Sequence, residues 1–347
     1  MAGFVPNGRV FVLGAGASAF AGYPLASGLL TFIRNYTSLE VKTRERASRV
    51  IGKLNEAEFH FTREVVRDPN GVANLEELLT YLEIYHSFPG TPFSINPWNS
   101  SDSADIRSVV TSGFLEYQYD LNGRTWGDGA ARGIVGEVST AWARLIRPGD
   151  VILTFNWDIL HEVILWRHGL WSYRDGYNFR CDEQGQAERS SGTLMLKLHG
   201  SVNWVQENDG DSVGYIADVK DFFSGSKDWD WRPHDNEAQA DSGRKLVLPT
   251  YLKDISSNKV LLDVWTKAHR VIRDAREMIV VGYSLNAVDH PARLLFGTAL
   301  SENASLGCVT VVSPDTGEWG EFLTRINKRV SPVRQKFEDW VCSAGRT

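Results

Sequence analysis

The sequence predicts an α/β protein, a Rossmann-like parallel sheet with a helical insertion subdomain. Short apolar runs typical of buried strands alternate with helix-like segments along the 347-residue chain, which is the pattern of an open parallel sheet. Small polar residues follow directly after several of these runs, where parallel sheets gather their ligand-binding groups. The helical stretch between the first strand and the next is too long for one crossover helix, so we expect a subdomain there.

The composition narrows the class of protein. Apolar residues make up 42% of the chain and charged residues 23%, which is ordinary for a globular protein. The formal charge of −6 gives no electrostatic case for direct nucleic-acid or membrane binding. Cys181, Cys308 and Cys342 are far apart and form no C-x-x-C pair, so neither a disulfide framework nor a cysteine zinc site is supported. No membrane-spanning run is present in the sequence, and we expect no cleavable leader and a cytoplasmic location.

The first strand is predicted at residues 10–13, and it ends in a turn without bulky side chains. The residues of this turn are Gly14, Ala15, Gly16, Ala17 and Ser18. Glycines let the backbone lie close to a ligand, and exposed N–H groups at a helix start favour an anion. The turn therefore indicates a phosphate cradle, and the alternative is a tight strand-to-helix turn that binds nothing.

The following residues predict the insertion. Helical character is expected at residues 25–36, 37–61, 106–119 and 130–146, with loops at 87–103 and 121–129. A capping-box-like start at Asn74 precedes leucines spaced three and four apart, which predicts a helix with one apolar face. We divide the chain into a Rossmann domain at 1–35 and 149–330, a helical insertion at 36–148 and a C-terminal tail at 331–347.

The second half of the chain returns to alternating elements. Strands are predicted at residues 151–155, 193–198, 245–248, 278–281 and 308–312. Helices are predicted at residues 158–168, 261–276 and 317–328, and a further helix is predicted after Asp289, which caps it, with Pro291 in its first turn. Residues 201–243 are predicted to form a long acidic excursion.

Four motifs fall just beyond predicted strands, at residues 14–18, 156–158, 199–201 and 282–284. Because ligands bind outside the carboxyl ends of parallel strands, their shared placement predicts one common site. The Asn156 amide offers a donor and an acceptor for a sugar hydroxyl or a water, and the Asp158 carboxylate offers acceptors. The His199 imidazole suits proton transfer at neutral pH. The structural alternatives are an Asx turn with Asp158 as helix cap and a histidine bonded to backbone.

With these motifs in view, the chain resembles the sirtuin superfamily. The matching positions, in the family's order, are Gly14, Ala15, Gly16, Ser18, Ala21, Gly22, Pro24, Thr154, Asn156, Asp158, His199, Gly200, Gly282, Ser284 and Leu285. The four zinc-binding cysteines of sirtuin deacylases are missing, residues 25–27 replace their D-F-R, and Phe155 replaces a glutamine. The chain is more similar to the bacterial sirtuin-like NAD hydrolases of anti-phage defence, which share the K-L-H-G-S found here at residues 197–201 and lack the zinc module.

The resemblance implies an NAD⁺ glycohydrolase that releases nicotinamide and ADP-ribose, with NAD as substrate and no metal. Asn156, Asp158 and His199 are then expected to be catalytic, with His199 as general base. The expected cofactor-binding residues are Gly14, Ala15, Gly16, Ala17, Ser18, Pro24, Thr154, Gly282, Ser284 and Asp315. The family also implies a homo-oligomer and a neighbouring-gene partner such as a hexameric ATPase (helicase) or a short Argonaute. The alternatives are a non-catalytic NAD or ADP-ribose sensor and an NAD-dependent protein deacylase.

Overall fold

The computed structural model describes the chain in segments separated by gaps. The described residues are 6–35, 41–64, 75–76, 78–80, 82, 100–126, 132–172, 176–177, 192–206, 213–215, 244–246, 255, 259–286 and 289–344. The predicted capping box at Asn74, the loop at 87–99 and most of the acidic excursion lie outside these residues.

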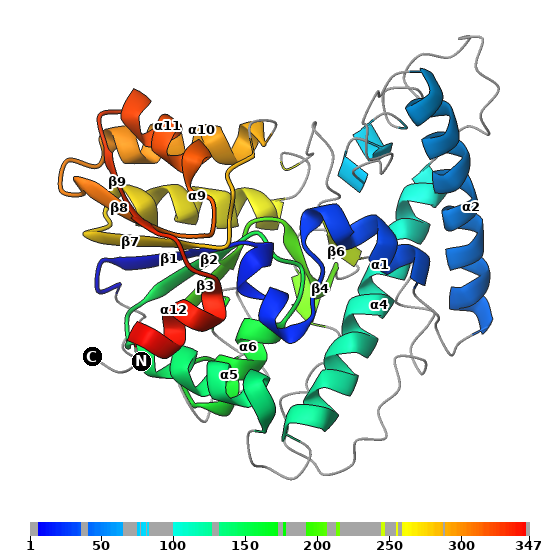
Figure 1. Ribbon diagram of the computed structural model, residues 1–347, viewed down its shortest axis with the longest axis horizontal. Helices are drawn as coiled ribbons and strands as arrows, with labels where there is room; N and C mark the ends of the chain where they lie inside the picture. The colour runs from blue at the N-terminus through cyan, green and yellow to red at the C-terminus, as the bar shows by residue number, and fades with distance from the viewer. Residues whose placement is uncertain are drawn as a thin grey trace.

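A six-stranded sheet forms the centre of the molecule, and all of its neighbouring strands are parallel (Figure 1). Its strands are β1 (Arg9–Leu13), β2 (Val151–Thr154), β3 (Leu194–Lys197), β7 (Glu277–Val281), β8 (Cys308–Val312) and β9 (Arg329–Val333). They are arranged in the order β3-β2-β1-β7-β8-β9. Counted along the chain within this sheet, that is 3-2-1-4-5-6, the order of doubly wound dinucleotide-binding folds. The predicted fold class is confirmed.

The strand order reverses between β1 and β7, which are neighbours in the sheet but far apart in the sequence. Leu13 at the end of β1 is paired with Thr154 of β2 and with Val281 of β7. The three strands therefore end at the same level. The crevice beyond this switch point is where an open parallel sheet binds its ligand.

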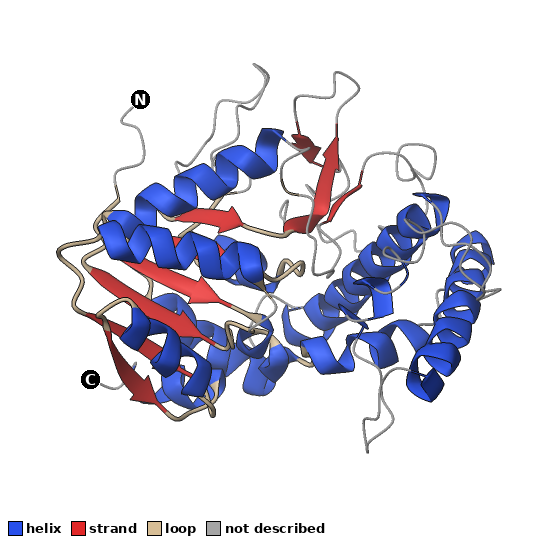
Figure 2. Cartoon of the chain, turned by 90° about the horizontal axis from the view of Figure 1, so that it is seen from above, coloured by secondary structure: helices blue, strands red, loops and turns tan. Residues whose placement is uncertain are grey.

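Helices cover both faces of the sheet (Figures 1 and 2). One face carries α9 (Lys259–Arg273), α10 (His290–Glu302) and α11 (Gly317–Arg325), and the other carries α5 (Gly133–Leu145), α6 (Leu160–Arg167) and α12 (Phe337–Ala344). In α9 the buried residues Leu261, Val264, Ala268 and Ile272 are spaced three and four apart, as an amphipathic helix requires.

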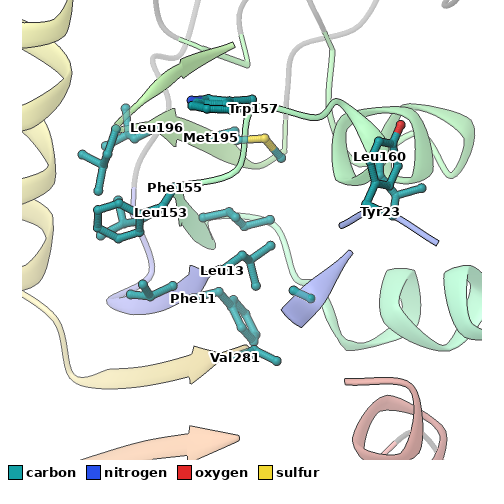
Figure 3. Packing of buried hydrophobic residues seen from close by; sticks show 14 of the residues in the cluster. Phe11, Leu13, Tyr23, Leu153, Phe155, Trp157, Leu160, Met195, Leu196 and Val281 are labelled. Carbon is teal, nitrogen blue, oxygen red and sulfur yellow. The ribbon is translucent and has the colours of Figure 1, made fainter. Parts of the chain in front are cut away.

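The strands bury their side chains on both faces, because both faces are covered. Every residue of β1, β2 and β3 is buried. Figure 3 shows Phe11, Leu13, Leu153 and Leu196 from these strands packing with Val281 of β7 in one core. This core holds the strand ends level and so fixes the residues that follow them.

Two helices of the predicted insertion at residues 36–148, α2 (Val41–Glu64) and the long α4 (Ser100–Trp126), lie to one side of the sheet together with α1 (Leu29–Asn35) (Figure 2). α5 also falls within residues 36–148, but it covers a face of the sheet (Figure 1). Described residues between α2 and α4 are also helical, and their leucines, Leu75, Leu78, Leu79 and Leu82, are buried as predicted. The division of the chain into domains stays a prediction.

Both predicted loops were wrong where the structure describes them. Residues 100–103 and 121–126 belong to α4 and not to loops, because Leu121 and Trp126 are buried apolar residues that extend its packed face past the exposed Gly123. The strand predicted at residues 245–248 is β6 (Arg244–Leu246), which lies outside the parallel sheet. The C-terminal segment forms β9 and α12, and Phe337 and Val341 anchor α12 in the core.

A second sheet of three strands stands beside the first. It consists of β4 (Gly200–Gln206), β5 (Val213–Tyr215) and β6 in the antiparallel order β5-β4-β6. The sequence did not predict β4 and β5. β4 begins directly after His199 and continues from β3, so this sheet extends from the carboxyl edge of the parallel sheet. None of the helices in the described residues combines the length and apolar character needed to cross a membrane.

Candidate functional site

The four sequence motifs follow β1, β2, β3 and β7 at one edge of the sheet. The residue after each strand donates its backbone N–H to the last residue of a neighbouring strand. These bonds are Gly14 to Val281 (3.0 Å), Phe155 to Leu13 (3.1 Å), Leu198 to Thr154 (2.9 Å) and Gly282 to Val312 (3.0 Å). The backbone pairing therefore continues one residue beyond the strands and places the motifs along a single edge.

The glycines of this edge pack backbone against backbone. The Gly16 N–H donates to the Gly282 carbonyl at 3.0 Å. A Cβ atom on Gly14 would lie 2.6 Å from that carbonyl oxygen, and one on Gly282, whose φ is +63°, would lie 2.5 Å from the Ala17 nitrogen. These glycines let the two turns at the switch point touch, and that contact explains them without a ligand.

The N–H groups of the turn are mostly engaged within the protein, contrary to the expected cradle of exposed amides. Gly14 and Gly16 donate to Val281 and Gly282, while Ala17 and Ser18 donate to Gly14 and Ala15. The last two bonds form because the turn winds into a 3-10 helix over Ala15–Ala17. Ligand contact by this turn, including contact with a phosphate, stays a prediction.

The Asn156 side chain links the end of β2 to the glycine turn. Its Nδ2 atom donates to the Gly14 carbonyl oxygen at 2.9 Å and to the Ser18 hydroxyl oxygen at 3.1 Å. Thr154 supports it by accepting the Asn156 backbone N–H at its Oγ1 atom (3.1 Å). Both amide hydrogens are thus committed, while Oδ1 has no hydrogen-bond partner among the residues that the structure describes. Asn156 therefore presents an acceptor whose direction is fixed by the protein.

Asp158 follows Asn156 by two residues and is 4% exposed. Its Oδ1 atom accepts the Leu160 N–H at 3.1 Å, and the Ser18 hydroxyl is hydrogen-bonded to the same carboxylate. Burial raises the pKa of Asp158 from 3.8 to about 6, although the neighbouring Lys197 ammonium opposes the rise. The predicted Asx turn is present, but α6 begins two residues later than expected, with Ile159 as its cap.

A buried polar network contacts the Asp158 backbone through Lys197. The sequence analysis gave the members of this network no role. The Lys197 ammonium contacts the Glu162 carboxylate at 2.6 Å and the Asp158 carbonyl oxygen at 2.5 Å. Tyr177 donates to Glu162 at 3.0 Å, and Asn203 of β4 donates to Tyr177 at 3.2 Å. Lys197 and Glu162 are at most 1% exposed. A lysine ending an apolar strand was the sequence signal for this network, since a buried charge requires a partner.

The His199 side chain, at the end of β3, is 9% exposed. Its ring makes a T-shaped contact with Phe155, with ring centroids 5.0 Å apart. The preceding carbonyl, of Leu198, accepts the Trp265 indole N–H at 2.8 Å. His199 and Asn156 thus follow adjacent strands of the sheet, and Phe155 connects the two positions.

Three other predicted site residues lie at half-buried or exposed positions. Pro24 is half-buried and Ser284 is exposed. Asp315 is also exposed and accepts the Gly317 N–H at 3.0 Å, which starts α11. Asp289 precedes α10 as expected, but its carboxylate accepts the Tyr283 hydroxyl at 2.9 Å and does not cap the helix. Ligand contacts by these residues stay predictions.

The segment after the turn is held by α4 and α12. Tyr117 of α4 donates to the Ala21 carbonyl at 2.8 Å, and Tyr23 donates to Gln118 of α4 at 2.8 Å. On the other side the rings of Phe20 and Phe337 stack at 5.2 Å. The helical region and the C-terminal helix therefore both help to set the position of this segment.

His161 is buried behind the turn and contacts Trp142 and Phe337 at 5.8 and 5.6 Å. Burial lowers the pKa of His161 from 6.5 to about 3, so its imidazole is neutral at physiological pH. This geometry is that of a packed core histidine.

The fold and the edge residues define a doubly wound α/β protein with a polar site at its switch point. No family model and no curated protein matches the sequence. Several solved structures do match the chain, two of them as follows. A Sir2 mutant with a p53 peptide and NAD is 13% identical, with 98% of this chain and 92% of that chain covered and a TM-score of 0.39. A structure from a study of the mechanism and regulation of Sir2 enzymes is 13% identical, with 97% and 92% covered and a TM-score of 0.32.

Proposed function

We propose that the protein is an NAD⁺ glycohydrolase that cleaves NAD⁺ into nicotinamide and ADP-ribose. The observation that carries the proposal is the strand order, which places the glycine turn and the residue pair Asn156 and His199 at the carboxyl edge of one doubly wound sheet. Dinucleotides bind at this edge in such sheets. The sequence resemblance to sirtuin-like NAD hydrolases supplies the choice of reaction.

The chemistry matches the groups available. Nicotinamide is already cationic in NAD⁺, so its departure needs no general acid. Water attacks the anomeric carbon of the ribose, the bond from that carbon to the nicotinamide nitrogen breaks, and the His199 imidazole takes the proton from the water. The Asn156 Oδ1 atom accepts a hydrogen bond from that water or from a ribose hydroxyl, because its amide hydrogens are held by Gly14 and Ser18.

Asp158, which we expect among the catalytic residues, fits a supporting role better than direct contact with the ligand. Its carboxylate is buried and bonded to Ser18 and to the Leu160 N–H. Through Ser18 it helps to hold the Asn156 amide in one orientation. Ser284 and Asp315 remain our candidates for the adenosine half of the ligand, and residues 14–18 and Pro24 for the phosphates.

Two other functions remain open for this site. A sensor that binds NAD⁺ or ADP-ribose without turnover would use the same crevice. A protein deacylase is disfavoured by the lack of the zinc cysteines in the sequence. Among the described residues no group of histidine, cysteine and acidic side chains could hold a metal ion.

We further propose that the protein is the effector subunit of a bacterial anti-phage system. A homo-oligomer and a neighbouring-gene partner, either a hexameric ATPase or a short Argonaute, belong to this proposal. Residues 36–148 are proposed as its insertion subdomain. The support for these points is the sequence resemblance.

The test is NAD⁺ loss and nicotinamide release by purified Asn156→Ala and His199→Ala variants, measured by chromatography. Loss of a general base costs roughly 10²- to 10⁴-fold in rate, so we expect little turnover from His199→Ala. His168→Ala is the matched control, since His168 is exposed and ends α6 at the far end of that helix. Undiminished turnover in both site variants would reject the assignment. Calorimetric binding of NAD⁺ without nicotinamide release would favour the sensor.

A further inference from the structure

Two aromatic rings beside His199 form a stack that the proposed chemistry does not use. The rings of Phe155 and Tyr283 are parallel, with centroids 4.1 Å apart and 4° between their planes. The His199 imidazole meets Phe155 at 5.0 Å and 77°. The imidazole therefore contacts a ring that is itself stacked on a second ring, and its T-shaped contact with Phe155 is a geometry that aromatic pairs prefer.

The stack is fixed from outside the site. The Tyr283 hydroxyl donates to Asp289 at 2.9 Å, and its carbonyl oxygen accepts the Trp319 indole N–H at 2.7 Å. Phe296 of α10 lies 6.1 Å from the Phe155 ring and 6.3 Å from the Tyr283 ring. Contacts from α10 and α11 thus hold the Tyr283 ring in place.

Separate hydrogen bonds to the backbone fix the positions of Phe155 and of the start of the His199 side chain. Phe155 is anchored by its N–H bond to Leu13, and the Leu198 carbonyl is bonded to Trp265. These bonds set where the His199 side chain starts, but they do not select its rotamer. The Phe155 ring occupies one side of the imidazole and limits the staggered positions open to it.

We propose that the Phe155–Tyr283 pair is a positioning element that sets the orientation of the His199 imidazole for proton transfer. This inference rests on the proposed NAD⁺ hydrolysis. A misplacement of about 1 Å in a reacting group costs on the order of 100-fold in rate. Loss of either ring is therefore expected to lower kcat, while binding of NAD⁺ changes little because neither ring is assigned to the ligand.

The kinetic test uses Phe155→Leu and Tyr283→Leu, with Phe322→Leu as a matched control. Phe322 is 7% exposed, as Phe155 is, and it packs on Trp319 in α11. We expect kcat to fall by roughly 10- to 100-fold in the first two variants with KM within about twofold, and a near-normal rate in the control. A rise in KM at unchanged kcat, or an equal loss in all three variants, would overturn the proposal.

A second readout needs no turnover. In protein labelled in its histidine rings, NMR signals of His199 are assigned by their loss in His199→Gln. They should shift in both leucine variants and stay in place in Phe322→Leu. Unmoved signals in both leucine variants overturn the positioning role. Shifted signals in a protein without NAD⁺ turnover support that role and reject the hydrolase, so the two failures are distinct. If Phe155→Leu does not fold, Tyr283→Leu at its half-buried site decides alone.

Discussion

The buried Asp158 carboxylate should destabilise the fold at neutral pH, and Asp158→Asn tests this. Its pKa is raised from 3.8 to about 6 by burial. A carboxyl group whose pKa is higher in the folded state favours folding while it is protonated, and this contribution is lost as the pH rises through the folded pKa. The difference between the two pKa values corresponds to about 3 kcal/mol in the free energy of unfolding.

The assay is urea unfolding of the wild type and of Asp158→Asn between about pH 4.5 and about pH 7.5, where about 2 kcal/mol of that effect is expressed. The asparagine stays neutral, so the stability of the variant relative to the wild type should rise by that amount over the range. Other titrating groups cancel in the difference. Asp120→Asn, at an exposed position on α4, controls for the change from acid to amide. A difference that is flat or falls with increasing pH would refute the reasoning.

Three further predictions concern the edge and the core around it. Gly282→Ala should lower the free energy of unfolding by at least about 2 kcal/mol more than Gly133→Ala does, as measured by thermal unfolding. Both glycines have a positive φ, but only a Cβ atom on Gly282 would meet backbone atoms. Equal losses of stability in the two variants would contradict the packing argument. Lys197→Met should lower the free energy of unfolding by about 3–5 kcal/mol, because it leaves the Glu162 carboxylate buried without its cation. The double variant with Glu162→Leu should recover most of that stability. A double variant that is no more stable than Lys197→Met would refute this. The lowered pKa of His161 means that stability is lost as pH falls below about 6.5, so His161→Leu should resist mild acid better than the wild type in circular dichroism; an unchanged acid midpoint would count against it.

The sequence predicted the sheet well because the cause of each strand is local. A run such as β1 is apolar throughout, which is what a strand covered on both faces requires. It also predicted that the four motifs share one edge, because parallel strands present their carboxyl ends together. α4 was predicted too short, since its continuation past Gly123 depends on tertiary burial of Leu121 and Trp126.

The site could be predicted only in part. The residue types at its edge were evident from their position after the strands. The roles of Lys197 and Glu162 were not, because they lie 35 residues apart and their pairing appears only when β3 packs beside α6. The stacking of Tyr283 on Phe155 likewise joins turns that follow different strands.

By itself, the sequence determined that the chain forms a parallel α/β sheet with its polar motifs beyond the strand ends, since strand burial and turn chemistry are local properties. Only the tertiary structure decided how those motifs work. The glycines of residues 14–16 allow contact with Gly282, and the Asn156 amide is turned so that its oxygen is available. These outcomes depend on which backbone atoms of distant segments meet, and no local pattern encodes that contact.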